Sequence, residues 1–170
     1  ELTQTILSLS KFFKMLEDEE TKAMFQKNVK SVRRLLDRVS EYLPEERIRE
    51  YTMKLDGLPS IGPAVPRSEE DSAFVDFEKI RDLITETIEA EIGRGLEDQK
   101  ARINRLGGVE KLLKRGIVGV DVYKLYLNIF SDTPGTEWVE RLRYVNLLGD
   151  QIEKIEQRVT KQNHIDHYLD

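Results

Sequence analysis

The chain has 170 residues, of which 39% are hydrophobic and 35% are charged, and its formal net charge is -5. This hydrophobic content is enough for a packed core and argues against an intrinsically disordered chain. The acidic balance argues against a protein that coats nucleic acid or a membrane with its whole surface. Because the chain has no cysteine, disulfides, thiolate chemistry and cysteine-bound zinc are excluded, and a cytoplasmic location is expected. No apolar run is long enough for a membrane span.

The first part of the chain carries two apolar series that are out of phase with each other. Each series steps by four and three residues, which is the spacing of one face of a helix. The first series is Leu2, Ile6, Leu9, Phe13 and Leu16, and the second is Phe25, Val29, Val32, Leu36, Val39 and Leu43. The gap between the series breaks the heptad register, so we expect two helices joined by a tight turn, with one kinked helix as the alternative. A third, short helix is expected from Pro44 to Gly57.

The central part is a long helix that follows a connection rich in proline and glycine. Residues 57–67 hold three prolines and two glycines, which indicates a non-helical connection. Ser68 or Asp71 is expected to cap the following helix, which we expect to run as far as Leu106. Gly93 and Gly95 lie inside this helix, and each weakens it by about 1 kcal/mol relative to alanine, so a bend or break is expected there.

Three further helices are expected in the last part of the chain. Val109–Arg115 is short, and Val122–Phe130 is apolar on all sides and is therefore expected to be central and buried. Thr136–Asp170 reads as one long amphipathic helix, whose end at residues 150–170 is expected to project. No strand-period alternation occurs. We therefore predict a single all-α domain over residues 1–170, a helical bundle of about six to eight helices with long N-terminal, central and C-terminal helices.

The far half of the last helix is the predicted partner interface. Its apolar stripe narrows after Gly149, and the width is typical of a seam between two helices. The predicted interface residues are Leu148, Ile152, Ile155 and Val159. The preferred hypothesis is a non-enzymatic interaction or assembly module that self-associates as a homo-oligomer or binds a partner helix. The alternative is that Leu2–Leu16 or Phe25–Leu43 covers this seam within the chain.

A basic segment supports a second hypothesis. Residues 99–124 carry seven basic and two acidic side chains, and Lys111, Lys114 and Arg115 could neutralise phosphates in a salt-dependent manner. Two turns, Leu58–Pro63 and Gly107–Val109, resemble the hairpin of helix-hairpin-helix proteins. That resemblance implies turn amides that meet a phosphate. Binding of nucleic acid or of a phosphate ligand through residues 100–115 is therefore the alternative function.

Acidic and histidine residues give a third hypothesis. The acidic rows Glu78, Asp82, Glu86, Glu89 and Asp150, Glu153, Glu156 resemble those of all-α nucleotide pyrophosphohydrolases, which implies magnesium-dependent hydrolysis. Arg158 to His164 resembles the Arg-x4-6-His pattern of HEPN ribonucleases, which are all-helical and dimeric, and His164 with His167 has a spacing that could chelate a metal. The competing interpretation is an ordinary solvated helix face. No catalytic residue, metal or cofactor is predicted, because no phosphate loop, dinucleotide fingerprint, zinc-peptidase motif or nucleophile elbow occurs.

Overall fold

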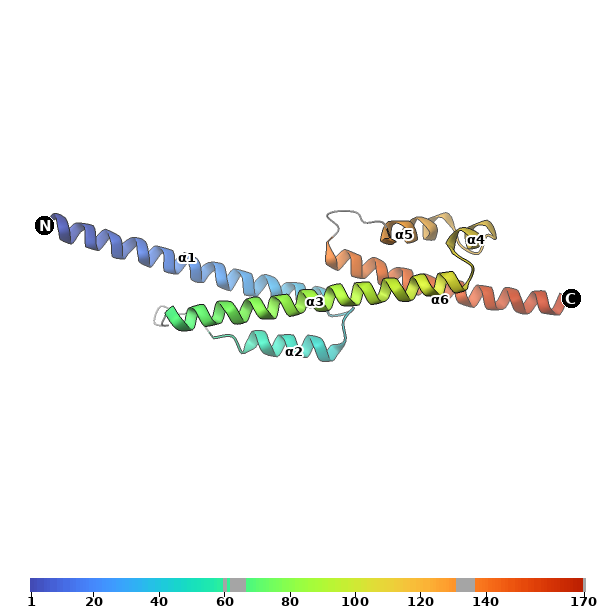
Figure 1. Ribbon diagram of the computed structural model, residues 1–170, viewed down its shortest axis with the longest axis horizontal. Helices are drawn as coiled ribbons and strands as arrows, with labels where there is room; N and C mark the ends of the chain where they lie inside the picture. The colour runs from blue at the N-terminus through green and yellow to red at the C-terminus, as the bar shows by residue number, and fades with distance from the viewer. Residues whose placement is uncertain (60, 62–66, 131–136, 170) are drawn as a thin grey trace. The chain divides into compact units, whose positions relative to one another are not determined.

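The computed structural model describes residues 1–59, 61, 67–130 and 137–169, and these residues form six α-helices with no strand among them. The helices are α1 (Leu2–Val39), α2 (Glu45–Asp56), α3 (Arg67–Arg105), α4 (Val109–Lys114), α5 (Val120–Phe130) and α6 (Trp138–Leu169), as labelled in Figure 1. The prediction of an all-α fold with long N-terminal, central and C-terminal helices is confirmed. Most of the predicted connection at residues 57–67, including residues 60 and 62–66, lies outside the described residues.

The chain divides into two compact units. Unit 1 comprises Glu1–Ser40 and Pro44–Thr85, and unit 2 comprises Glu41–Leu43 and Glu86–Asp170. Each unit has its own apolar core.

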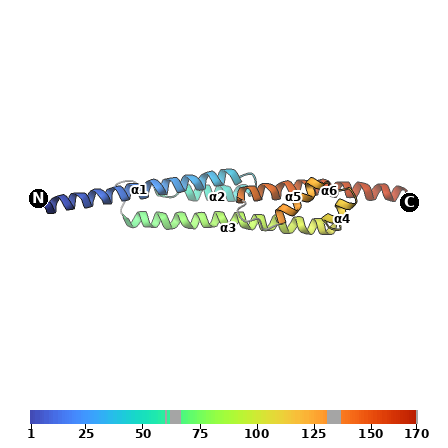
Figure 2. The ribbon, with the colours of Figure 1, turned by 90° about the horizontal axis from the view of Figure 1, so that it is seen from above.

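In unit 1, α1 and the first part of α3 run in the same direction, and α2 returns along the second half of α1 (Figures 1 and 2). The ring of Phe25 on α1 packs edge-on against Phe74 and Phe77 of α3, with ring centroids 4.8 and 5.7 Å apart. One turn earlier, the Lys22 ammonium lies 3.4 Å from the Glu70 carboxylate, in a pair whose side chains are mostly covered. These contacts show that α1 and α3 run parallel, because residues with higher numbers on α1 contact residues with higher numbers on α3.

The prediction of two N-terminal helices joined by a turn is wrong, because α1 is one uninterrupted helix. The break in register between the two apolar series is therefore a change of face. At 100° per residue, the mean direction of the first series lies about 140° around the helix from that of the second series. The second series faces the core of unit 1, where Phe25, Val32, Leu36 and Val39 are buried. The first series consequently points away from that core.

In unit 2, α6 lies along the second part of α3 and runs parallel to it. The carboxamide nitrogen of Gln99 on α3 donates a hydrogen bond to the backbone carbonyl oxygen of Val145 on α6. Further along both helices, the Arg102 guanidinium donates to the Glu156 carboxylate. The apolar side chains that α6 buries in this unit are Leu142, Val145, Leu148, Ile152 and Ile155.

The break predicted at Gly93 and Gly95 does not occur, because both residues lie within the continuous helix α3. A Cβ atom on Gly95 would lie 2.6 Å from Cγ1 of Val145, closer than real side chains approach. Around Gly93, by contrast, nothing lies within 4 Å of the same position. Gly95 therefore allows α6 to pack closely against α3, a role that depends on a neighbour far away in the sequence.

The prediction that the apolar helix at residues 122–130 is central and buried is also wrong. Only Ile129 of α5 is fully buried, and Val120 and Leu127 are exposed. α5 packs against α4 and α6, and these contacts leave much of its surface exposed or half-buried. An apolar composition on all sides is thus not enough to place this short helix at the centre of unit 2.

Candidate interaction surface

The partner interface predicted on α6 is covered within the chain, so this assignment is corrected. Leu148 and Ile152 are fully buried and Ile155 is 2% exposed, whereas Val159 is half-buried. The Gln99 and Arg102 contacts show that α3 of the same unit lies along this part of α6. The narrowing of the apolar stripe after Gly149 reflects an intramolecular seam. From Thr160 onward, the described side chains of α6 are exposed.

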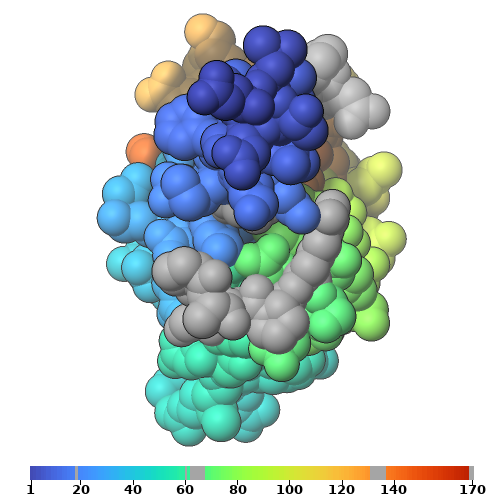
Figure 3. All heavy atoms as spheres, turned by 90° about the vertical axis from the view of Figure 1, so that its left-hand side faces the viewer, coloured from blue at the N-terminus to red at the C-terminus, as the bar shows by residue number. Residues whose placement is uncertain are grey.

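The exposed apolar surface lies instead on the first half of α1. We define the α1 stripe as the following exposed residues, with their exposed fractions: Leu2 80%, Ile6 60%, Leu9 50%, Phe12 51%, Phe13 60% and Leu16 43%. Every described side chain from Glu1 to Thr21 is exposed. Figure 3 looks toward the end of unit 1 from which α1 begins and shows the atoms of these first turns in the foreground. No described part of unit 1 covers the α1 stripe.

The α1 stripe is large for a surface with no partner. With about 200 Å² for each large apolar residue, its exposed fractions amount to roughly 700 Å². A protein that works as a monomer rarely exposes a contiguous apolar patch of more than about 300–600 Å². The stripe is also nearly uncharged, because Lys11 and Lys14 are the only charged residues between Glu1 and Glu17. This surface has the extent and chemistry of an interface.

The sequence contains the signal for this surface, because the series Leu2 to Leu16 forms one apolar face of a helix. An apolar face at helical spacing is typical of both a core helix and an interface helix. The information that separates the two is the phase break before Phe25, which turns the two faces of one helix in different directions. That information becomes usable only once α1 is known to be continuous.

The basic segment predicted to bind phosphate is exposed. Lys111 and Lys114 on α4 and Arg115 at its C-terminal end are solvent-accessible, and none of them has an ion pair within the described part of the chain. The turn before α4 differs from a phosphate-binding hairpin in one respect. The backbone N–H of Gly108 donates to the carbonyl oxygen of Ile103 at 3.0 Å, and that of Gly107 donates to Asn104 at 3.1 Å. Both turn amides thus close the end of α3.

The acidic rows and the histidines are not brought together into a site. Within the described residues, no three or more histidine, aspartate or glutamate side chains are arranged to hold a metal ion. Glu156 is paired with Arg102, and this hydrogen bond raises the pKa of the Arg102 guanidinium above its ordinary value. Arg158 donates to the carbonyl oxygen of Ile117 at 3.2 Å, whereas the ring of His164 contacts Tyr168 at 5.1 Å. The residues of the ribonuclease-like pattern therefore have different partners.

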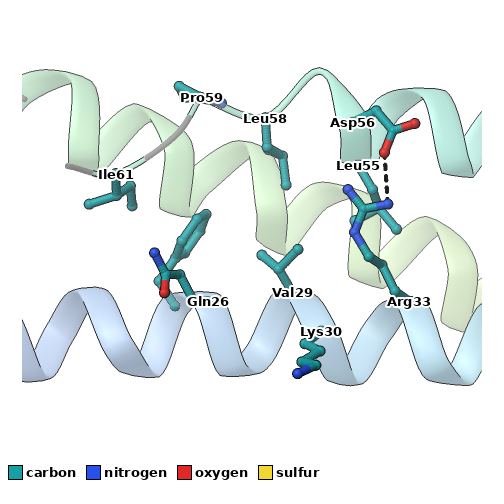
Figure 4. A pocket seen from close by; sticks show the side chains of 10 residues that line it. Gln26, Val29, Lys30, Arg33, Leu55, Asp56, Leu58, Pro59 and Ile61 are labelled. Carbon is teal, nitrogen blue, oxygen red and sulfur yellow. Dashed lines mark ion pairs between the residues drawn. The ribbon is translucent and has the colours of Figure 1, made fainter.

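Unit 1 also has an open pocket of about 380 Å³ between α1 and the end of α2 (Figure 4). Its lining combines apolar side chains, with Val29, Leu55 and Leu58 facing the space, and the polar side chains of Gln26 and Lys30. The charged pair at one end, Arg33 and Asp56, is joined by an ion pair of 2.7 Å. Among the described lining residues there is no serine, threonine, cysteine or histidine, and the Asp56 carboxylate is paired with Arg33.

Comparisons with protein-family models, with curated proteins and with solved structures find no match to this chain. No helix in the described ranges has both the length and the apolar character needed to cross a membrane.

Proposed function

We propose that this chain is a non-enzymatic assembly module that self-associates through the α1 stripe. The observation that carries the proposal is a heptad series, Leu2 to Leu16, which is exposed on a continuous helix and faces away from the core of its own unit. The proposal keeps the expected mode of association, through a long amphipathic helix, and moves it from α6 to α1. A cytoplasmic location is part of the proposal and is supported by the absence of cysteine.

The stability of α1 supports an external partner. An isolated helix is marginal in water below about 12–15 residues, and in proteins most of the stability of a helix comes from the packing of its apolar face. The first 20 residues of α1 receive no packing from the described residues of unit 1, whereas the segment from Phe25 onward is held by α2 and α3. Burial of the α1 stripe in a complex would supply the packing that this segment lacks.

A second copy of the chain is the occupant that the surface favours. A standard protein interface buries about 800 Å² on each partner, and the roughly 700 Å² of the α1 stripe is close to that value. Apolar residues at alternating steps of four and three also match a copy of themselves, as in coiled coils. An interfacial membrane helix, by contrast, has a polar face rich in lysine and arginine. The first 16 residues of this chain contain only two basic residues, Lys11 and Lys14.

Multi-angle light scattering on the wild type and two aspartate variants tests the proposal. Ile6 is 60% exposed, so its burial removes about 120 Å² from water and contributes about 3 kcal/mol for each chain. Ile6→Asp should therefore weaken association by at least about 100-fold. Met15→Asp is the matched control, because Met15 is 54% exposed but lies outside the α1 stripe.

The expected result is a wild-type mass above that of one chain, lost in Ile6→Asp and kept in Met15→Asp. A wild type that stays monomeric at high micromolar concentration contradicts self-association. If the monomer binds lipid vesicles or a partner helix through the same residues, the surface is functional but its occupant is different.

Binding of nucleic acid or of another phosphate ligand is the second candidate. It is supported by the exposure of Lys111, Lys114 and Arg115, which have no ion pair in the described ranges. A titration of single-stranded and duplex oligonucleotides at two salt concentrations tests it. Affinity should fall with salt and fall further in the triple glutamine variant. No binding at low salt would remove this candidate.

A further inference from the structure

We infer that two copies of this chain associate in an antiparallel manner through α1, with Leu9 of one copy opposite Phe13 of the other. The inference rests on the proposed function and adds the direction and register of the pairing. It follows from the charges that continue the α1 stripe along the helix, and from the position of Phe12 beside it.

The line of the stripe continues into charged residues. From Ile6 and Phe13, the same heptad position recurs at Glu20, Lys27 and Arg34, each seven residues after the one before. All three charged side chains are exposed. α1 has no break over this range, so these residues lie on nearly the same side of the helix as the stripe.

A parallel pairing in register would place each of these charges opposite its own copy. Glu20 would face Glu20, Lys27 would face Lys27, and Arg34 would face Arg34. Like charges at facing positions are destabilising in paired helices. A parallel seam would therefore change from attractive to repulsive directly after Leu16.

An antiparallel pairing avoids this repulsion. When residue numbers on the two helices add up to about 22, Ile6 packs on Leu16 of the other copy and Leu9 packs on its Phe13, and both contacts occur twice. Lys27 and Arg34 then lie beyond the overlap, and Glu20 lies at its end, opposite Leu2 and far from Glu20 of the other copy. The central apolar residues Ile6 to Leu16 are paired with one another, and none of these charged side chains faces its own copy.

Phe12 distinguishes the two directions independently. It lies on the flank of the stripe, one residue before Phe13, and is 51% exposed. In a parallel pair of helices, a residue on this flank contacts the residue five positions later on the other helix. The Phe12 ring would therefore lie beside the Glu17 carboxylate of the other copy. In the antiparallel register, Phe12 lies close to Phe12 of the other copy, and two aromatic rings attract each other in this setting.

The absence of cysteine allows a direct test by disulfide cross-linking. The variants are Leu9→Cys and Phe13→Cys, each in the full chain. A disulfide requires Cα atoms within about 7 Å. In the antiparallel register this condition is met between position 9 of one copy and position 13 of the other, so mild oxidation should give a covalent dimer only when the two variants are mixed. Lys11→Cys, on the opposite side of the helix, is the control that should not cross-link.

A covalent dimer formed by either variant alone would show a parallel pair and overturn the inference. A mixture that does not cross-link, although the wild type is dimeric, overturns it as well. A wild type that sediments as a monomer refutes the proposed function itself, so the two failures are distinguishable.

Spin labels on Thr21→Cys give a second measurement that does not depend on a disulfide. Position 21 is exposed and lies outside the overlap. The antiparallel register separates the two labels by about 30 Å along the helix axis, whereas a parallel pair brings them level with each other. Pulsed electron resonance should therefore show a distance of about 30 Å or more. A distribution centred near 20 Å contradicts the antiparallel register.

Discussion

Substitution of Gly95 tests the close packing between α3 and α6. In an unobstructed helix interior, alanine in place of glycine stabilises by about 1 kcal/mol. At Gly95 the added Cβ atom would lie 2.6 Å from Cγ1 of Val145, so one of the helices must move. Overpacking of this kind costs typically about 1–3 kcal/mol. The sum of both effects predicts that Gly95→Ala is neutral or destabilises the chain by up to about 2 kcal/mol.

Gly93→Ala is the matched control two residues away in the same helix. No atom lies within 4 Å of its Cβ position, so this variant should gain the full benefit of about 1 kcal/mol. Thermal and urea unfolding followed by circular dichroism would measure the difference, which we expect to be about 1–3 kcal/mol. Val145→Ala removes the clashing methyl group and should reduce the cost of Gly95→Ala in a double-mutant cycle. Equal stabilisation by Gly93→Ala and Gly95→Ala would refute the close contact.

Four further substitutions test the assignments of burial. Ile152→Asp should lower the free energy of unfolding by about 3 kcal/mol or more, because it places a charge at a fully buried position. A variant that stays folded and only associates more weakly would instead support the partner interface predicted on α6. Gln99→Met should leave the free energy of unfolding in urea unchanged or raise it, because the Gln99 carboxamide oxygen is buried without a hydrogen-bond partner in the described ranges. A decrease in this free energy of more than about 1 kcal/mol would contradict the expectation. Phe77→Ala should cost about 3–5 kcal/mol, since Phe77 is buried against Phe25; Phe12→Ala, at an exposed ring, should change the unfolding of the monomer by less than about 0.5 kcal/mol.

The regular parts of the fold were predictable from the sequence. The apolar periodicity of residues 136–170 predicts one long helix, and α6 extends without a break from Trp138 to Leu169. Pro44 and Gly57 mark the ends of the short helix that precedes the connection, and the structure places this helix, α2, at Glu45–Asp56. These features depend on local preferences that act within a few residues, and the sequence displays them directly.

The errors arise where the outcome depends on a distant neighbour. Gly95 reads as a weak point in α3, but Val145 makes it a point of close contact. α5 reads as a buried helix, yet α4 and α6 cover only part of its surface. Leu148, Ile152 and Ile155 read as an open seam until α3 is placed along α6. In each case the local pattern allows two environments, and only the tertiary arrangement selects between them.

The sequence was also not enough to identify the candidate interaction surface on α1. The residues of the α1 stripe were recognised as one face of a helix, but their exposure could not be known without the direction in which that face points. A continuous α1 directs the face away from α2 and α3. The occupant of the surface is then a matter of chemistry, and an apolar, nearly uncharged heptad series favours a copy of itself.

Hydrogen exchange at two protein concentrations tests the central claim most directly. If the α1 stripe is covered by association, the backbone amides of residues 2–16 should exchange rapidly in dilute solution and become protected as concentration rises. The amides of residues 25–39, which are held by α2 and α3, should show the same protection at both concentrations. Exchange at residues 2–16 that does not change over a concentration range from nanomolar to high micromolar would contradict self-association through α1.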